Sequence, residues 1–206
     1  MKNVVNYKLY LVTDRDILKG RDISAAVEEA IKGGVTVVQL REKSISSLEF
    51  YNIAVEVKKV TDKYNVPLII NDRLDIALSV DAAGIHVGQG DMPAPITRNL
   101  VGQNKVLGVS VATVEEAKKA EADGADYIGV GAMFPTSTKD DARAVSIEVL
   151  KEIKDSVNIP VVAIGGINSK NLSLLKPSKI DGIAVVSEIL GKEDVRGAAE
   201  ILSAAF

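Results

Sequence analysis

The sequence contains no cysteine, no tryptophan and a single histidine among its 206 residues. Without cysteine, disulfide bonds and thiolate metal sites are excluded. The lone histidine, His86, excludes a metal site with several histidine ligands and an acid/base pair of histidines. The candidate functional groups are therefore oxygen, amide and cationic side chains.

An excess of positive charge and long apolar runs are also lacking. The chain has 25 lysine and arginine residues against 28 aspartate and glutamate residues, and its formal net charge is −3. Nucleic-acid-binding proteins usually carry a basic excess, so we expect no nucleic-acid partner. No run approaches the roughly 20 apolar residues that span a bilayer, and the N-terminus has no small-residue cleavage pattern. We expect a cytoplasmic protein with no membrane partner, and the sequence is compatible with a homo-oligomer.

Short apolar runs alternate with longer amphipathic segments along the chain. The short runs are rich in valine, isoleucine and leucine and mostly lack strict alternation, which is typical of parallel strands buried on both faces. The expected strands are 9–13, 35–40, 67–70, 84–87, 106–109, 127–131, 160–164 and 182–186. The expected helices are 23–32, 47–64, 74–80, 94–100, 114–122, 147–156, 168–175 and 195–205.

Such regular spacing of strand–helix units predicts a single (β/α)8 TIM barrel that forms one catalytic domain over residues 1–206. No linker, low-complexity tract or change in composition divides the chain. An open, doubly wound sheet is the alternative.

Polar residues collect where the expected strands end, and in a TIM barrel these ends form the active-site face. Asp72 and Asp91 follow two strands that would be neighbours. Two carboxylates with room for water and phosphate oxygens suit Mg²⁺, so they are the candidate metal pair. The structural alternative is that Asp72 caps the next helix and Asp91 lies in a turn.

Gln39, Arg41 and Lys43 share one face of the second expected strand because they are two residues apart. Arginine suits a bidentate contact with phosphate, and lysine supplies a point charge. Glu42 would point the other way or into the loop. The alternative is a solvated strand end in which arginine and glutamate pair.

A second candidate anion site surrounds the ends of the sixth, seventh and eighth strands. Hydroxyl side chains and a lysine follow the sixth strand, and small residues with accessible backbone amides follow the other two. Its members are Thr136, Ser137, Thr138, Gly166, Val186 and Ser187, whereas Lys139 is assigned to the first site, with the cations and the metal pair. Two anion sites imply two phosphorylated ligands, one of which carries a diphosphate that needs Mg²⁺.

Two further residues invite a catalytic interpretation. His86 lies inside the fourth expected strand, where a buried, hydrogen-bonded structural histidine is at least as well supported as a base. Ser110 ends the fifth strand, but nothing nearby in the sequence would activate it as a nucleophile. A ligand-binding hydroxyl is the better interpretation of Ser110.

Several of these segments together resemble the thiamine phosphate synthase family. The segments that carry the resemblance are Leu-Tyr-Leu-Val-Thr-Asp at 9–14, Val-Gln-Leu-Arg-Glu-Lys at 38–43, Ile-Asn-Asp-Arg at 70–73, Gly-Ile-His-Val-Gly-Gln at 84–89, Asp-Met-Pro at 91–93, Gly-Val-Ser at 108–110, Phe-Pro-Thr-Ser-Thr-Lys at 134–139 and Ala-Ile-Gly-Gly-Ile-Asn at 163–168. They run in order over about residues 9–190, and those at 38–43 and 134–139 are distinctive.

The resemblance implies a Mg²⁺-dependent TIM-barrel transferase. It would join hydroxymethylpyrimidine diphosphate to a thiazole phosphate, giving thiamine phosphate and diphosphate, by a dissociative reaction without a covalent enzyme nucleophile. By motif, the pyrimidine diphosphate would be bound by Gln39, Leu40, Arg41, Glu42, Lys43, Asn71, Ser110 and Lys139. Of these, Arg41, Lys43, Ser110 and Lys139 would be catalytic. The metal ligands would be Asp72 and Asp91, and the thiazole phosphate would be held by Thr136, Ser137, Thr138, Gly166, Val186 and Ser187.

Two other functions fit the same fold. One is an isomerase acting on a single phosphorylated heterocycle, such as the related thiazole tautomerase, which would need a base but no diphosphate site. The other is a catalytically silent barrel that binds a thiamine precursor and regulates. The presence of Asp72, Asp91 and Lys139 argues against both.

Overall fold

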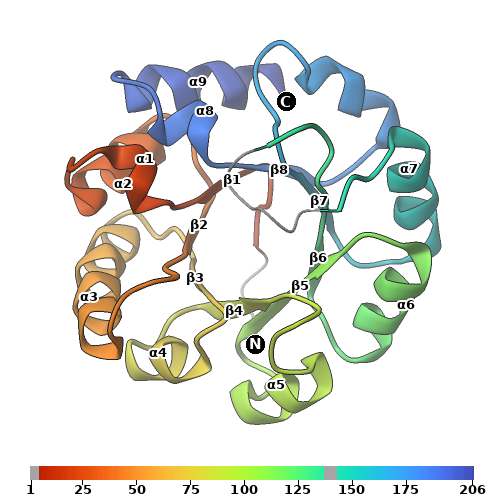
Figure 1. Cartoon of the computed structure of the whole chain (residues 1–206), viewed down its shortest axis with the longest axis horizontal. Coiled ribbons are helices and arrows are strands. Elements are labelled where there is room, and N and C mark those ends of the chain that lie inside the picture. The colour runs from red at the N-terminus through yellow and green to blue at the C-terminus, as the bar shows by residue number, and fades with distance from the viewer. Residues whose placement is uncertain (1–4, 137–142) are drawn as a thin grey trace.

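A computed structural model describes residues 5–136 and 143–206 of the chain. Eight parallel strands pair in chain order, and β1 also pairs with β8, so the sheet is a closed barrel. Helices surround the barrel on the outside (Figure 1). The structure therefore confirms the predicted (β/α)8 TIM barrel and excludes the open, doubly wound sheet.

The strands and helices match the predicted segments with small shifts at their ends. The strands are β1 (Leu9–Val12), β2 (Val37–Leu40), β3 (Leu68–Asn71), β4 (Gly84–Val87), β5 (Val106–Val111), β6 (Tyr127–Val130), β7 (Val161–Ile164) and β8 (Gly182–Val185). The helices are α1 (Arg15–Leu18), α2 (Ile23–Lys32), α3 (Ser47–Lys63), α4 (Leu74–Ser79), α5 (Ala94–Val101), α6 (Val114–Ala122), α7 (Ile147–Ser156), α8 (Ser187–Leu190) and α9 (Val195–Ala205).

Three segments differ from the prediction. The helix expected over 168–175 is instead a 3₁₀ helix, η1 (Leu172–Ser178), which contains Pro177. Its start is delayed because the Asn168 side chain accepts backbone N–H bonds from Lys170 and Asn171, which closes a turn first. The short helices α1 and α8 were not predicted.

Side-chain caps fix where most of the long helices begin. Ser46, Thr113 and Ser146 each accept a hydrogen bond from the backbone N–H three residues ahead, at the starts of α3, α6 and α7. Such a cap satisfies one of the unpaired N–H groups of the first turn and is worth about 1 kcal/mol. The caps therefore fix where the loops before α3, α6 and α7 become helices.

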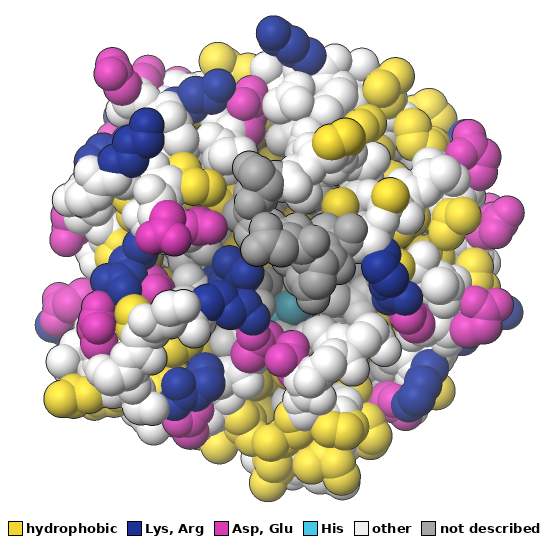
Figure 2. Space-filling model, viewed as in Figure 1, with side chains coloured by type: hydrophobic (Ala, Val, Ile, Leu, Met, Phe, Trp, Pro, Cys, Tyr) yellow, Lys and Arg dark blue, Asp and Glu magenta, His cyan; other side chains and the backbone are white. Residues whose placement is uncertain are grey.

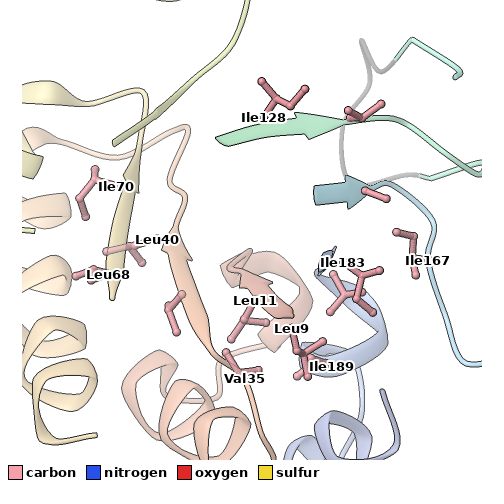
Figure 3. Close-up of a cluster of buried hydrophobic side chains, with 14 of the residues drawn as sticks. Leu9, Leu11, Val35, Leu40, Leu68, Ile70, Ile128, Ile167, Ile183 and Ile189 are labelled. Atoms are coloured by element: carbon pink, nitrogen blue, oxygen red, sulfur yellow. The ribbon is translucent and has the colours of Figure 1, made fainter. Parts of the chain in front are cut away.

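The apolar side chains form two layers, one on each face of the barrel. Alternate residues of β1 show the division: Leu9 and Leu11 pack outward against the helices, whereas Tyr10 and Val12 fill the barrel interior. Figure 3 shows the outer layer, where Leu9 and Leu11 lie close to Val35 and Ile189. This division explains the near-continuous apolar strands, because both faces of each strand are buried.

The parallel register brings polar residues together inside one end of the barrel. Asn71 at the end of β3 is paired with His86 of β4, and Ser110 of β5 is paired with Gly129 of β6. The cluster lies at the carboxyl ends of the strands, the face predicted to carry the site. In the part of the chain that the structure describes, no helix is long and apolar enough to cross a membrane.

Candidate active site

A cavity of about 590 Å³ opens at the carboxyl ends of the strands. Its polar lining includes Gln39, Arg41, Lys43, Asn71, Asp72, His86, Asp91, Ser110, Thr136 and Ser187. Figure 2 views this end of the barrel, where the histidine colour is seen in the mouth beside basic and acidic side chains. Residues from all eight strands or the loops after them contribute to the cavity, so only the closed barrel assembles it.

Only alternate residues of the segment 39–43 line the cavity. Gln39, Arg41 and Lys43 line the cavity, as the two-residue spacing predicted. The Arg41 backbone N–H donates to Thr13 Oγ1 at 3.0 Å, which ties the end of β2 to β1. Two cationic side chains and an amide are therefore held on one side of the mouth.

The side chains of Leu40 and Glu42 do not enter this cavity. Leu40 is fully buried in the outer layer between barrel and helices. Glu42 Oε1 lies 2.9 Å from Arg15 Nε, and the glutamate side chain is only 6% exposed. Burial is the main reason that the pKa of Glu42 is raised despite this ion pair. Neither residue lines the cavity, so the ligand role predicted for them stays a prediction without support from the structure.

Asp72 and Asp91 meet at the edge of the cavity. Asp72 has a left-handed backbone with φ 59°, and its N–H donates to the His86 carbonyl oxygen at 2.9 Å. Asp72 Oδ2 accepts from Lys43 Nζ at 2.6 Å, and Asp91 Oδ2 accepts from the Gly88 N–H at 2.7 Å. Desolvation of the carboxyl group, followed by the closeness of Asp72, raises the pKa of Asp91. The helix-cap alternative is not observed for Asp72, because Arg73 is the N-cap of α4.

The predicted second anion site lies on the opposite side of the same cavity. Thr136, Gly166, Val186 and Ser187 all line it. Gly166 has φ 63°, and a Cβ atom there would lie 2.5 Å from the Pro135 carbonyl oxygen, so only glycine fits. Its remaining predicted members, Ser137 and Thr138, lie outside the described residues, and so does Lys139, which is predicted to bind the diphosphate.

His86 and Ser110 are in direct contact, which the sequence did not predict. His86 Nε2 lies 2.8 Å from Ser110 Oγ, and His86 Nδ1 lies 2.8 Å from the Tyr127 hydroxyl. The Tyr127 hydroxyl lies 2.7 Å from that of Tyr10. His86 is buried and hydrogen-bonded, in agreement with the structural interpretation of this residue. No signal in the sequence predicts this contact, because it depends on the register that pairs His86 with Gly108, two residues before Ser110.

The barrel and its mouth define the class of protein as a TIM-barrel enzyme with its candidate site at the carboxyl ends of the strands. Residues 9–189 match the family model described as thiamine monophosphate synthase. Thiamine-phosphate synthase of Clostridium tetani is 65% identical over 96% of this chain and 95% of its own length. The Alkaliphilus oremlandii protein of the same name is 62% identical over 99% of this chain and 98% of its own length.

A solved structure agrees with these sequence relatives. The thiamine phosphate pyrophosphorylase of Pyrococcus furiosus superimposes with a TM-score of 0.90 at 42% identity, covering 97% of this chain and 95% of that one. The chain therefore belongs to the thiamine monophosphate synthase family, and it is an enzyme of the transferase class.

Proposed function

We propose that this chain joins hydroxymethylpyrimidine diphosphate to a thiazole phosphate, forming thiamine phosphate and releasing diphosphate. The observation that carries the proposal is the composition of one cavity. Its one side holds Arg41, Lys43 and two carboxylates, and its other side holds Thr136 and Gly166. Two anion-binding regions that share one cavity suit two phosphorylated substrates whose reacting atoms must meet between them.

The carboxylate side fits a diphosphate with Mg²⁺. Across residues 5–136 and 143–206, no three acidic or histidine side chains gather closely enough to hold a metal ion by themselves. Mg²⁺ is commonly bound by only one or two carboxylates, with water and substrate phosphates completing its shell. The oxygen-only pair of Asp72 and Asp91 fits that pattern, and bound Mg²⁺ would neutralise charge on the diphosphate oxygens.

The glycine side fits a phosphate monoester without metal. Gly166 belongs to the loop after β7, and the absence of a Cβ atom there lets this loop pack against the Phe134 and Pro135 carbonyl groups of the loop after β6. Ser187 begins α8 one residue after the end of β8, and Thr136 also belongs to the cavity lining. Hydroxyl and backbone N–H donors at this edge of TIM barrels commonly bind phosphate.

The proposed reaction breaks one carbon–oxygen bond and forms one carbon–nitrogen bond. The diphosphate leaves with the electron pair of the C–O bond, and the pyrimidine methylene becomes a cation. Arg41 and Lys43 stabilise the negative charge that grows on the leaving oxygens, and the resemblance assigns Lys139 to the same task. The thiazole nitrogen then donates its lone pair to the cation. No protein atom forms a bond to the substrate.

The proposal is tested with pure protein, both substrates and Mg²⁺. Diphosphate release and thiamine phosphate formation are followed together, and we expect one mole of each per turnover. EDTA should abolish both, and excess Mg²⁺ should restore them. Product that forms equally fast without divalent metal would remove Asp72 and Asp91 from the metal site. Conversion of the thiazole phosphate alone would favour the isomerase instead.

A further inference from the structure

A row of hydrogen-bonded polar side chains crosses the barrel along the lining of the cavity and ends at Ser110. It consists of Gln39, Tyr10, Tyr127, His86 and Ser110, and we refer to it as the buried polar chain. Gln39 Nε2 donates to the Tyr10 hydroxyl at 2.9 Å. The Tyr10 hydroxyl lies 2.7 Å from the Tyr127 hydroxyl. The contacts from Tyr127 to His86 Nδ1 and from His86 Nε2 to Ser110 Oγ are each 2.8 Å.

These contacts determine which atom is the donor in each hydrogen bond of the buried polar chain. Tyr10 accepts from Gln39, so its own proton is available to Tyr127. Tyr127 accepts that proton and donates its own to His86 Nδ1. Because Nδ1 is then the acceptor, the neutral ring carries its proton on Nε2 and donates it to Ser110 Oγ. The Ser110 proton is left to point elsewhere, and Ser110 lines the cavity.

The opposite direction is unfavourable with this amide orientation. If Tyr127 donated to Tyr10, the Tyr10 proton would have no acceptor among the described residues, since the hydroxyl contacts only Gln39 and Tyr127. Tyr10 is 1% exposed, and an unsatisfied buried donor costs about 1–3 kcal/mol. Burial also raises the pKa values of both tyrosines, which keeps them neutral proton donors.

Two glycines make room for the middle of the buried polar chain. A Cβ atom on Gly108 would lie 2.2 Å from Tyr127 Cζ, where no side chain can be accommodated. A Cβ atom on Gly129 would lie 3.3 Å from His86 Cε1. The rings of His86 and Tyr127 are then held with their centroids 5.5 Å apart. Strands β5 and β6 thus fit closely around these two rings.

We propose that Tyr127 is a positioning residue: it fixes His86 with its proton on Nε2, so that the Ser110 hydroxyl donates a hydrogen bond into the cavity. The atom that receives this bond is an acceptor on the pyrimidine diphosphate, so this part rests on the proposed function. The arrangement makes Ser110 a hydrogen-bond donor to the substrate. It also means that the His86–Ser110 contact does not activate a nucleophile, because the histidine nitrogen facing Ser110 carries a proton.

The tautomer can be measured directly because His86 is the only histidine in the chain. Uniform ¹⁵N labelling gives one imidazole pair in a long-range ¹H–¹⁵N spectrum of the free protein. We expect a protonated Nε2 and an unprotonated Nδ1. In Tyr127→Phe, Nδ1 loses its donor, and we expect a shift toward the other tautomer. A proton on Nδ1 of the unmodified protein would overturn the proposal, and so would an unchanged tautomer in Tyr127→Phe. Neither result depends on the reaction catalysed.

A double-mutant cycle of Tyr127 and Ser110 tests whether the buried polar chain affects kcat/KM for the pyrimidine diphosphate. One neutral hydrogen bond is worth about 1 kcal/mol, so Tyr127→Phe should lower kcat/KM for the pyrimidine diphosphate roughly fivefold. Ser110→Ala should lower it at least as much, and the double variant should be no worse than Ser110→Ala. Tyr64→Phe is the matched control, since its hydroxyl donates to Glu28 at 2.8 Å outside the barrel. If the losses in kcat/KM of the two single variants multiply in the double variant, Tyr127 and Ser110 act independently, and the proposal is contradicted.

Discussion

Replacing Lys43 with methionine tests whether the positive charge of this residue at the mouth serves turnover and not the stability of the barrel. Lys43 Nζ lies 2.6 Å from Asp72 Oδ2, but the lysine side chain is 52% exposed and the aspartate side chain 20% exposed. An ion pair so open to solvent contributes about 0–1 kcal/mol to stability. Methionine keeps much of the length of the side chain. We therefore expect the free energy of unfolding to fall by no more than about 1 kcal/mol.

The same substitution should have a much larger effect on turnover. If Lys43 stabilises the charge that grows on the departing diphosphate, its loss removes one preorganised donor from the transition state. Loss of such a donor lowers turnover by about 10²–10³, equivalent to about 2.7–4 kcal/mol. The assay is diphosphate release at saturating substrates and Mg²⁺, with urea unfolding of the same preparation.

Lys58→Met is the matched control for this measurement. Lys58 Nζ also lies 2.6 Å from a carboxylate, that of Asp62, but the pair belongs to helix α3 on the outside of the barrel. We expect this variant to keep full turnover. Equal turnover in the two variants would refute the role of Lys43 at the diphosphate. A fall in unfolding free energy of several kcal/mol in Lys43→Met would refute the stability argument.

Two further substitutions test the metal pair and the fold. Asp91→Asn retains an acceptor for the Gly88 N–H but removes a negative charge. The Mg²⁺ concentration for half-maximal activity should therefore rise at least tenfold. An unchanged Mg²⁺ concentration would contradict the assignment of Asp91 as a metal ligand. Arg98 is 6% exposed and donates to three backbone carbonyls and to Asp126. Arg98→Met should therefore cost about 3–5 kcal/mol and lower Tm by about 6–20 °C. Arg196→Met, on the surface of α9, should change Tm little, and equal shifts would contradict the argument.

Most of the fold could be predicted from the sequence because each strand is buried on both faces. This produces apolar runs that stand out from the amphipathic helices, and four helices, α2, α6, α7 and α9, begin and end as predicted. Helices α1 and α8 were missed because four residues are too few to show a helical period. The helix predicted over 168–175 failed for a local reason, since asparagine side chains close a turn before η1.

The candidate site was predictable where it depends on position along one strand. Alternation placed Arg41 and Lys43 in the cavity and turned Glu42 away. The contact between His86 and Ser110 depends instead on the register between β4 and β5, which the sequence of either strand does not specify. The buried polar chain also needs Tyr10 of β1 and Tyr127 of β6, which pair with different neighbours and meet only inside the closed barrel.

The central claim is that diphosphate and Mg²⁺ bind together between the basic and acidic side chains of one side of the mouth. A crystal structure of the protein with Mg²⁺ and diphosphate tests it most directly. The account predicts the metal ion on Asp72 and Asp91, with diphosphate oxygens bound by Arg41 and Lys43. Diphosphate bound beside Gly166 instead, with no metal ion on the two carboxylates, would contradict it.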